Sequence, residues 1–185
     1  MRLRRWIRLA AGTRGAQILE LAVALPLLVV FVVGIYDFSQ AFNTKEKLNF
    51  AARDGARFGS TQPTNDLSQN TPLSVIAIRD LVDADLLAAG INDCGLGSIQ
   101  QSGPAIWTAT GTCPNSSTFT LTIDRGFVVP PAATAVAPVQ QISTHIDLQY
   151  PYQWQFSSAI RLVVPGASYA GITIIDTDAL ATNQD

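Results

Sequence analysis

One carboxylate lies inside the most apolar segment of the chain. Residues 16–36 read AQILELAVALPLLVVFVVGIY, and Glu20 is the single charged residue among them. A carboxylate at the centre of a membrane helix costs about 2.5–3.5 kcal/mol, and less near an edge. Glu20 lies about 6 Å into the segment by helical rise. Two interpretations stay open from position alone: a shallow glutamate that reaches back to the lipid headgroups, and a charge kept for a partner.

The two cysteines, Cys94 and Cys113, are the next candidates for chemistry. Outside the cytoplasm of a bacterium they are expected to be oxidised. A bridge between them would close a loop of about 20 residues and stabilise the fold by about 3 kcal/mol in the chain-entropy model. The alternative is a metal pair, but two distant cysteines without a nearby histidine make a poor zinc site. We expect a disulfide.

The remaining titratable residues do not have the spacing of a catalytic or metal site. The single histidine, His145, falls on the polar side of an expected strand, and the chain has no glycine-rich phosphate loop. Asp176 and Asp178 are expected only to share one face of a strand near the chain end. Asp80, Asp83 and Asp85 are expected to form the solvated face of a helix, because three aspartates without a ligand loop make a poor cation site. The sequence therefore predicts neither an enzyme nor a bound metal or cofactor.

The apolar segment is long enough to cross a membrane, because 21 helical residues match the thickness of a bilayer core. Five arginines precede it: Arg2, Arg4, Arg5, Arg8 and Arg14. Basic flanks of a spanning helix stay in the cytoplasm, and beyond Asp37 twelve acidic residues outnumber seven basic ones. We expect a single-pass protein of the bacterial inner membrane with an extracytoplasmic body. The arginines form a short flank, which argues against nucleic-acid binding.

A cleaved secretory signal is the alternative explanation of the segment. Such signals have an apolar core of about 7–15 residues and a small-x-small cleavage site. The segment here is longer, and Ser39-Gln40-Ala41 is a poor cleavage site inside a stretch that continues as a helix. The pattern therefore favours a retained anchor.

The residues around Glu20 resemble the processing site of type IV prepilins and pseudopilins. Gly15 directly precedes the apolar segment, and Glu20 is the fifth residue after it. The resemblance implies that a prepilin peptidase in the membrane cuts between Gly15 and Ala16. The new amine of Ala16 would then be the counter-ion of Glu20 in the same or a neighbouring subunit, which would offset much of the cost of burying either charge. The chain departs from the pattern in its long, partly apolar leader.

A longer resemblance covers residues 15–59. It is carried by Glu20, by Leu25-Pro26, by Gly34 with the following IYDF, and by AARDGAR at residues 51–57. This stretch resembles the TadE-like family of the tight-adherence (Flp) pilus assembly system. The resemblance implies a minor, non-enzymatic, pseudopilin-like membrane protein whose partners are other pilin-like subunits and pilus assembly proteins. The alternative function is a membrane-anchored extracytoplasmic binding module.

The helix is expected to continue beyond the apolar segment, over residues 37–59. Small residues recur there at a spacing of four, which lets another element approach closely: Ala51, Ala52, Gly55, Ala56 and Gly59. This row packs either on the protein's own sheet, which we favour, or on another molecule. Asp54 and Arg57 are expected to pair on the solvated side.

A second helix is predicted over about residues 72–89, after a polar loop. The hydroxyl of Thr71 is expected to cap it, Pro72 to be its first residue and Gly90 to end it. Its apolar stripe is expected to consist of Leu73, Ile76, Ala77, Leu81 and Leu87.

The second half of the chain predicts antiparallel strands. Apolar and polar residues alternate over 118–124 and 144–150, and 106–110 and 170–178 are further candidates. A proline-bounded connection covers 129–138. For the aromatic cluster over 150–164, a core with a loop, a membrane contact and a subunit contact all stay open.

The predicted fold is α+β: a long N-terminal transmembrane helix that continues into a small domain with a second helix and an antiparallel sheet of three to four strands. The expected division is a basic leader (1–15), a transmembrane helix (16–36), its extension (37–59), the extracytoplasmic domain (60–178) and a polar tail (179–185).

Overall fold

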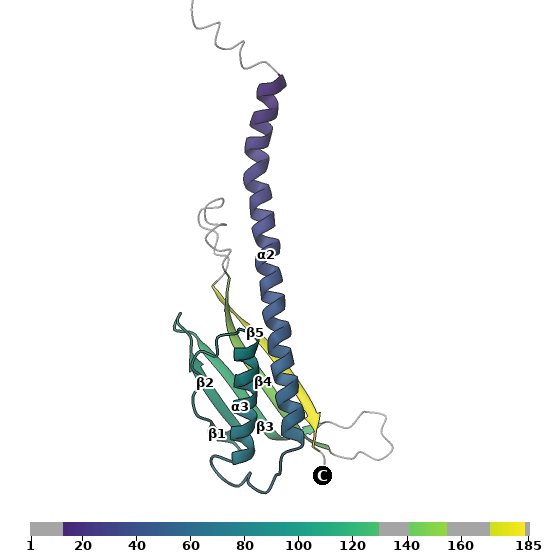
Figure 1. The fold of residues 1–185 in the computed structure, drawn as a ribbon, viewed down its shortest axis with the longest axis vertical. Coiled ribbons are helices and arrows are strands. Elements are labelled where there is room, and N and C mark those ends of the chain that lie inside the picture. The colour runs from purple at the N-terminus through teal and green to yellow at the C-terminus, as the bar shows by residue number, and fades with distance from the viewer. Residues whose placement is uncertain (1–12, 130–140, 155–170, 184–185) are drawn as a thin grey trace, which may run out of the picture. The chain divides into compact units, whose positions relative to one another are not determined.

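The structure is a computed structural model that describes residues 13–129, 141–154 and 171–183. These residues form two helices, α2 (Thr13–Ser60) and α3 (Leu73–Ala88), and five strands. The strands are β1 (Gln100–Gly103), β2 (Ile106–Thr112), β3 (Thr118–Val129), β4 (Gln141–Gln153) and β5 (Ile172–Thr182) (Figure 1). The leader up to residue 12, the connection at 130–138 and the cluster residues 155–164 lie outside the described part.

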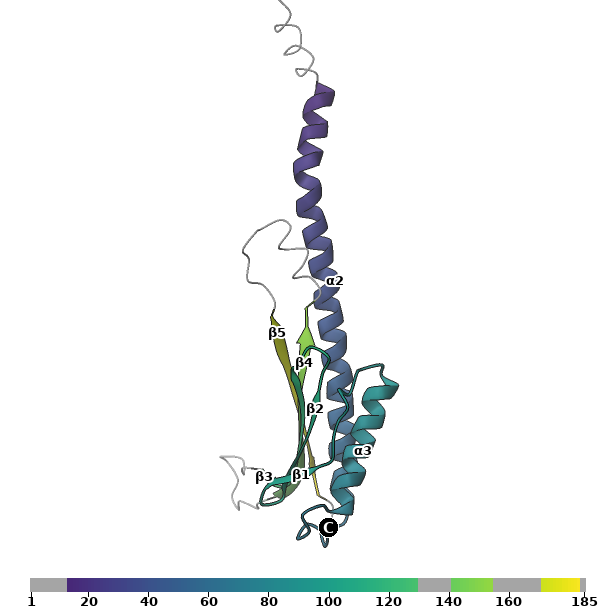
Figure 2. The ribbon, with the colours of Figure 1, turned by 90° about the vertical axis from the view of Figure 1, so that its left-hand side faces the viewer.

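The described residues fall into two compact units, and the boundary between them runs through α2. One unit holds α2 as far as Gln40, and the other begins at Ala41 and holds the rest of α2, α3 and the sheet. In the second unit, α3 and the last turns of α2 cover one face of the sheet, as two layers (Figure 2).

The sheet is an antiparallel meander in the order β1-β2-β3-β4-β5, so each strand pairs with its neighbour in sequence. The predicted α+β class is confirmed, but the expected count of three to four strands is too low. The additional strand is β1, whose four residues, QQSG, show no alternation of apolar and polar side chains. It pairs with β2. This pairing cannot be predicted from the sequence, because so short a polar segment lacks the alternation that marks a strand.

The core lies between the sheet and the two helices. Alternate residues of β3 are buried, among them Phe119, Leu121 and Ile123, as the period of two predicts. Trp107 of β2 is fully buried, and its indole nitrogen donates a hydrogen bond to the carbonyl of Asn70 at 3.1 Å. The loop before α3 is thereby tied to the sheet.

The row of small residues on α2 packs against the sheet and α3 of the same chain. Ala51, Ala52, Gly55 and Ala56 lie within it, and a Cβ atom built on Gly55 would lie 2.5 Å from Val82 Cγ2 and 2.8 Å from Ile146 Cδ1. A Cβ on Gly59 would lie 2.7 Å from the Thr144 methyl. The structure thus has the arrangement that we favoured, with the row filled by the protein's own elements.

The start of α3 differs from the prediction. Its N-cap is Pro72, not Thr71, and no side chain of the cap residue bonds to the helix. Asp66, from the preceding loop, takes that role: its carboxylate accepts hydrogen bonds from the Ser74 amide at 2.8 Å and from the Ser74 hydroxyl at 2.9 Å. An anion at a helix N-terminus is favoured by the unpaired amides and by the helix dipole.

The end of α3 is as predicted. Gly90 has a φ of +73° and donates a hydrogen bond to the Leu87 carbonyl at 3.0 Å, while the Ile91 amide donates to Leu86 at 2.9 Å. This pair of bonds is the Schellman motif, whose left-handed position favours glycine. Lys47 of α2 adds a hydrogen bond to the Ala89 carbonyl at 2.7 Å, where a cation complements the helix dipole.

The buried face of α3 is not the predicted stripe. Val75, Ile78, Val82 and Leu86 are fully buried, whereas the expected Leu73 is 74% exposed. The helix LSVIAIRDLVDADLLA has apolar residues on most of its circumference, so its sequence does not select one side. Contact with the sheet and α2 selects it.

Candidate functional site

The candidate site is the apolar part of α2. The described residues contain one helix long and apolar enough to cross a membrane, and its most apolar window has no residue buried inside the chain. Large side chains are exposed from Ile18 to Tyr36. Pro26 lies inside α2, and the helix continues past it. A helix that is apolar all round and uncovered by protein fits a lipid surrounding, with single-pass anchoring.

Gly15, Ala16 and Glu20 all lie within α2 and are exposed. Ala16 and Glu20 are four residues apart, so they are neighbours on one face of the helix. In residues 16–36, Glu20 is the single charged side chain, so a counter-charge must come from another part of the molecule or from another molecule. A carboxylate in apolar surroundings is stabilised by such a partner.

The second group of interest is a set of carboxylates on the open face of the sheet. Asp176 and Asp178 share one face of β5, as predicted, and Asp178 lies opposite Asp147 of β4. Burial and then the hydrogen bond and charge of Asp176 raise the pKa of Asp147 to about 6. His145 Nε2 lies 3.5 Å from the Asp178 carboxylate. In the described part of the chain, no three such groups have the geometry of a metal site.

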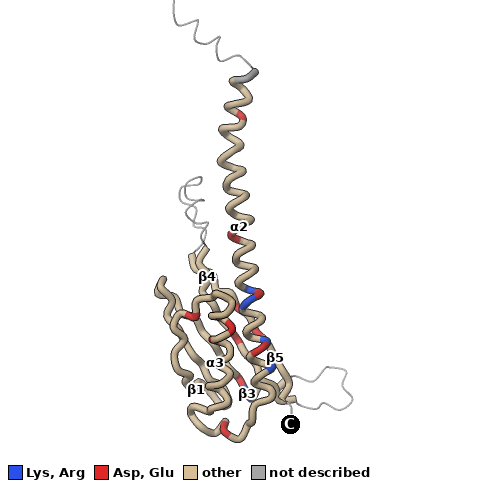
Figure 3. Tube along the Cα trace, viewed as in Figure 1, with Lys and Arg blue, Asp and Glu red and all other residues tan. Residues whose placement is uncertain are grey.

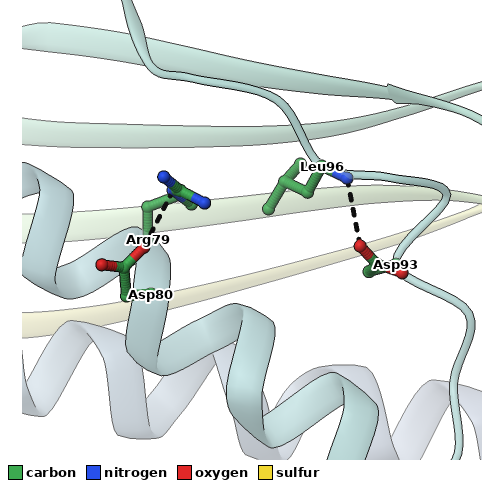
Figure 4. A network of polar contacts seen from close by, with 4 residues as sticks. All are labelled: Arg79, Asp80, Asp93 and Leu96. Carbon is green, nitrogen blue, oxygen red and sulfur yellow. Dashed lines mark hydrogen bonds and ion pairs between the residues drawn. The ribbon is translucent and has the colours of Figure 1, made fainter.

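The acidic residues of α3 are only partly solvated. Asp80 is exposed and lies 3.2 Å from Arg79 Nε; Figure 4 shows this pair on α3, and Asp93 in the loop beyond it. Asp83 and Asp85 are half-buried. Burial, and then the charge of Asp93, raises the pKa of Asp83. The prediction of a solvated face therefore holds for Asp80 and is wrong for the other two.

Asp85 is half-buried because it faces α2. Burial raises its pKa first, and the charge and hydrogen bond of Asp54 raise it further. The expected pairing of Asp54 with Arg57 is wrong, because among the described residues the arginine that lies within ion-pair distance of a carboxylate is Arg79, beside Asp80. Asp54 lies between the helices, so it meets a carboxylate of α3 in place of the arginine one turn away.

Sequence reasoning missed Arg125, which is 1% exposed. Its Nη2 donates to the Gln62 carbonyl at 2.9 Å, while Nε and Nη1 have no hydrogen-bond partner. Burial lowers its pKa, and the Asp66 carboxylate opposes that shift. The signal was present in the sequence, because the alternation of Leu121 and Ile123 continues to residue 125 and places it on the inner face.

The comparisons with known proteins bear on the candidate site. Residues 15–57 match the family model described as TadE-like protein, which confirms the resemblance seen in the sequence. All matched residues lie in α2, and they include Glu20 and the row of small residues except Gly59. No curated protein and no solved structure matches the chain.

Proposed function

We propose that this chain is a non-enzymatic, minor pseudopilin-like membrane protein that supports assembly of a tight-adherence (Flp, type IVb-like) pilus. One observation carries the proposal: the apolar part of the TadE-like segment, residues 16–36, is an exposed helix with a single charge, Glu20. A plain anchor has no need of a carboxylate in its apolar span, which costs free energy.

The proposed location is the bacterial inner membrane, with the N-terminus in the cytoplasm. The arginine-rich flank supports this orientation, since such flanks are retained on the cytoplasmic side. The disulfide between Cys94 and Cys113 also supports it, because disulfides persist in oxidising compartments. The sheet domain then faces the periplasm or the cell surface.

The proposed mechanism runs through the first turns of α2. The membrane holds the subunit, and a prepilin peptidase removes the leader between Gly15 and Ala16. The positive amine of Ala16 then lies one helical turn from Glu20 and can also reach the carboxylate of a neighbouring subunit. Pairing lowers the cost of both charges in lipid, so subunit contact is favoured where the charges meet.

The test combines mass spectrometry with one substitution. In cells with an active prepilin peptidase, the membrane-extracted protein should begin at Ala16. Glu20→Ala should leave insertion intact and reduce piliation strongly, while Leu21→Ala, a matched truncation on the same helix, should not. An intact N-terminus together with normal piliation of the Glu20 variant would refute the proposal and favour a membrane-anchored binding module.

A further inference from the structure

The cations of the sheet-bearing unit gather on one helix. Figure 3 shows most blue segments of that unit on the lower half of α2. They are Lys45, Lys47, Arg53 and Arg57. The other two in its described part are engaged elsewhere: Arg79 lies against Asp80, and Arg125 is buried.

The outer side of α2 carries an exposed row of aromatic and charged residues, here called the α2 stripe. Its members are exposed and follow each other at three or four residues: Phe42, Glu46, Phe50, Arg53 and Arg57. The buried row of small residues lies on the opposite side of the same helix. Phe42 and Phe50 are 66% and 64% exposed, so both present large aromatic surfaces on this side of the helix.

The opposite surface of the unit carries the complementary pattern, here called the β5 row. Alternate residues of β5 face away from the helices: Ile172, Ile174, Asp176, Asp178 and Leu180. Asp147 of β4 adds a carboxylate beside them. The surface is thus acidic at its centre with apolar side chains at both ends.

The two surfaces lie back to back. Gly55 of α2 packs on Ile146 of β4, which pairs with Ala179 of β5, and Gly59 packs on Thr144, which pairs with Ala181. The numbering of α2 and β5 therefore rises in the same direction, as Figures 1 and 2 also show.

The α2 stripe and the β5 row match in order and spacing when the two molecules are parallel. In the α2 stripe Phe50 comes directly before the two arginines, and in the β5 row Ile174 comes directly before the two aspartates. Arg53 and Arg57 are about 6 Å apart along the helix, and Asp176 and Asp178 about 7 Å apart along the strand. Gly55 is level with Ala179, so an axial offset of about one helical turn brings the two arginines level with the two aspartates.

The same offset brings Phe50 level with Ile174. We propose that copies of this chain pack side by side, with the α2 stripe of one copy on the β5 row of the next. The contact uses two different surfaces, so it is heterologous and can repeat along an open array. Copies stacked in this way stay parallel, as molecules in one membrane must be. The inference concerns the sheet-bearing unit and requires neither leader cleavage nor a role for Glu20.

Complementary charge favours a second copy as the occupant. Arginine and carboxylate form charge-assisted hydrogen bonds, and both partners of the pair are present on every copy. The approach of an arginine would also relieve the repulsion among the crowded carboxylates of β4 and β5. A different pilus protein on either surface is an outcome that the experiment distinguishes.

The test is cysteine cross-linking of the full chain in membranes. Its two native cysteines are paired, so introduced cysteines are the only free thiols. One tagged population carries Phe50→Cys and the other Ile174→Cys, which leaves the proposed charge pairs intact. A short bis-maleimide should give mixed-tag dimers at least tenfold above dimers within either population.

Charge reversal completes the test. Arg53→Asp with Arg57→Asp should abolish the mixed-tag dimer, and Asp176→Arg with Asp178→Arg on the other population should restore it. Reversal of the exposed Asp80 on α3 is the matched control and should change nothing. Folding of each purified variant is checked by the fluorescence of the buried Trp107, with Trp6 and Trp154 replaced by phenylalanine. Dimers within one population, cross-links only to a different protein, or yields that ignore charge reversal would each overturn the proposal.

Discussion

The core leaves no room for a side chain at Gly55 of α2. A methyl group on Gly55 would lie 2.5 Å from Val82 Cγ2 and 2.8 Å from Ile146 Cδ1. The δ-methyl of Ile146 can rotate away, but the γ-methyl of a valine in a helix is held by its strongly preferred rotamer. Gly55→Ala should therefore destabilise the domain, although alanine is the better helix former.

The magnitude follows from two opposing terms. The change from glycine to alanine in a helix interior gains about 1 kcal/mol. Overpacking of a filled core costs about 1–3 kcal/mol, and the upper end applies because Val82 cannot move and the atoms overlap by about 1 Å. We expect a net loss of about 2 kcal/mol in the free energy of unfolding. With an m-value of about 2 kcal/mol/M in urea, the midpoint falls by about 1 M.

The assay is urea unfolding of the full chain in detergent micelles, followed by the fluorescence of Trp107. Trp6 and Trp154 are replaced by phenylalanine in all variants so that the signal reports the core. Asn43→Ala, at an exposed position of α2, is the control and should be stabilising by a few tenths of a kcal/mol.

A double-mutant cycle isolates the steric cause. Val82→Ala removes the clashing methyl group, so Gly55→Ala should cost less in that background, with a coupling energy of at least about 1 kcal/mol. A Gly55→Ala protein as stable as the parent, or a cycle in which the two losses add, would refute the reasoning.

Three further predictions concern the same domain. Asp66→Ala should lower the free energy of unfolding by about 1–2 kcal/mol and speed hydrogen exchange in the first turn of α3, because the helix loses its cap; unchanged exchange there would contradict the capping role. Cys94→Ser with Cys113→Ser should cost about 3 kcal/mol, and reductant should then have no further effect on the urea midpoint. The raised pKa of Asp147 means that the folded protein holds a proton that the unfolded chain has released, so stability falls as pH rises from about 4 to about 6. Asp147→Asn should remove this part of the slope, about 1 kcal/mol after solvent screening, in urea titrations at stepped pH; an unchanged slope would assign it to other groups.

Local patterns in the sequence were sufficient to predict an element where its buried residues recur at a regular spacing. The alternation over β3 and the C-terminal stop at Gly90 were both readable, because each rests on the backbone geometry of a few consecutive residues. The same reasoning failed for β1, which is too short and polar to alternate, and for the stripe of α3, which is apolar on too many sides.

Partners that come from distant parts of the chain were not readable. Asp66 caps α3 from eight residues before Ser74, and Asp85 meets Asp54 across two helices. The spacing of apolar residues predicts which side of a helix or strand is buried, but it does not predict which segment covers that side.

The amino-acid order is enough to establish a membrane-length apolar helix with one carboxylate, its resemblance to the TadE-like family and an α+β domain behind it, since hydropathy and period are properties of neighbouring residues. Only the tertiary structure shows that Gly55 and Gly59 pack against the chain's own core. It also shows that the basic side of α2 lies directly behind the acidic side of β5. These relations depend on which surfaces meet when helix and sheet bury their apolar faces. That contact joins residues far apart in the chain, such as Gly55 with Ile146 and Gly59 with Thr144.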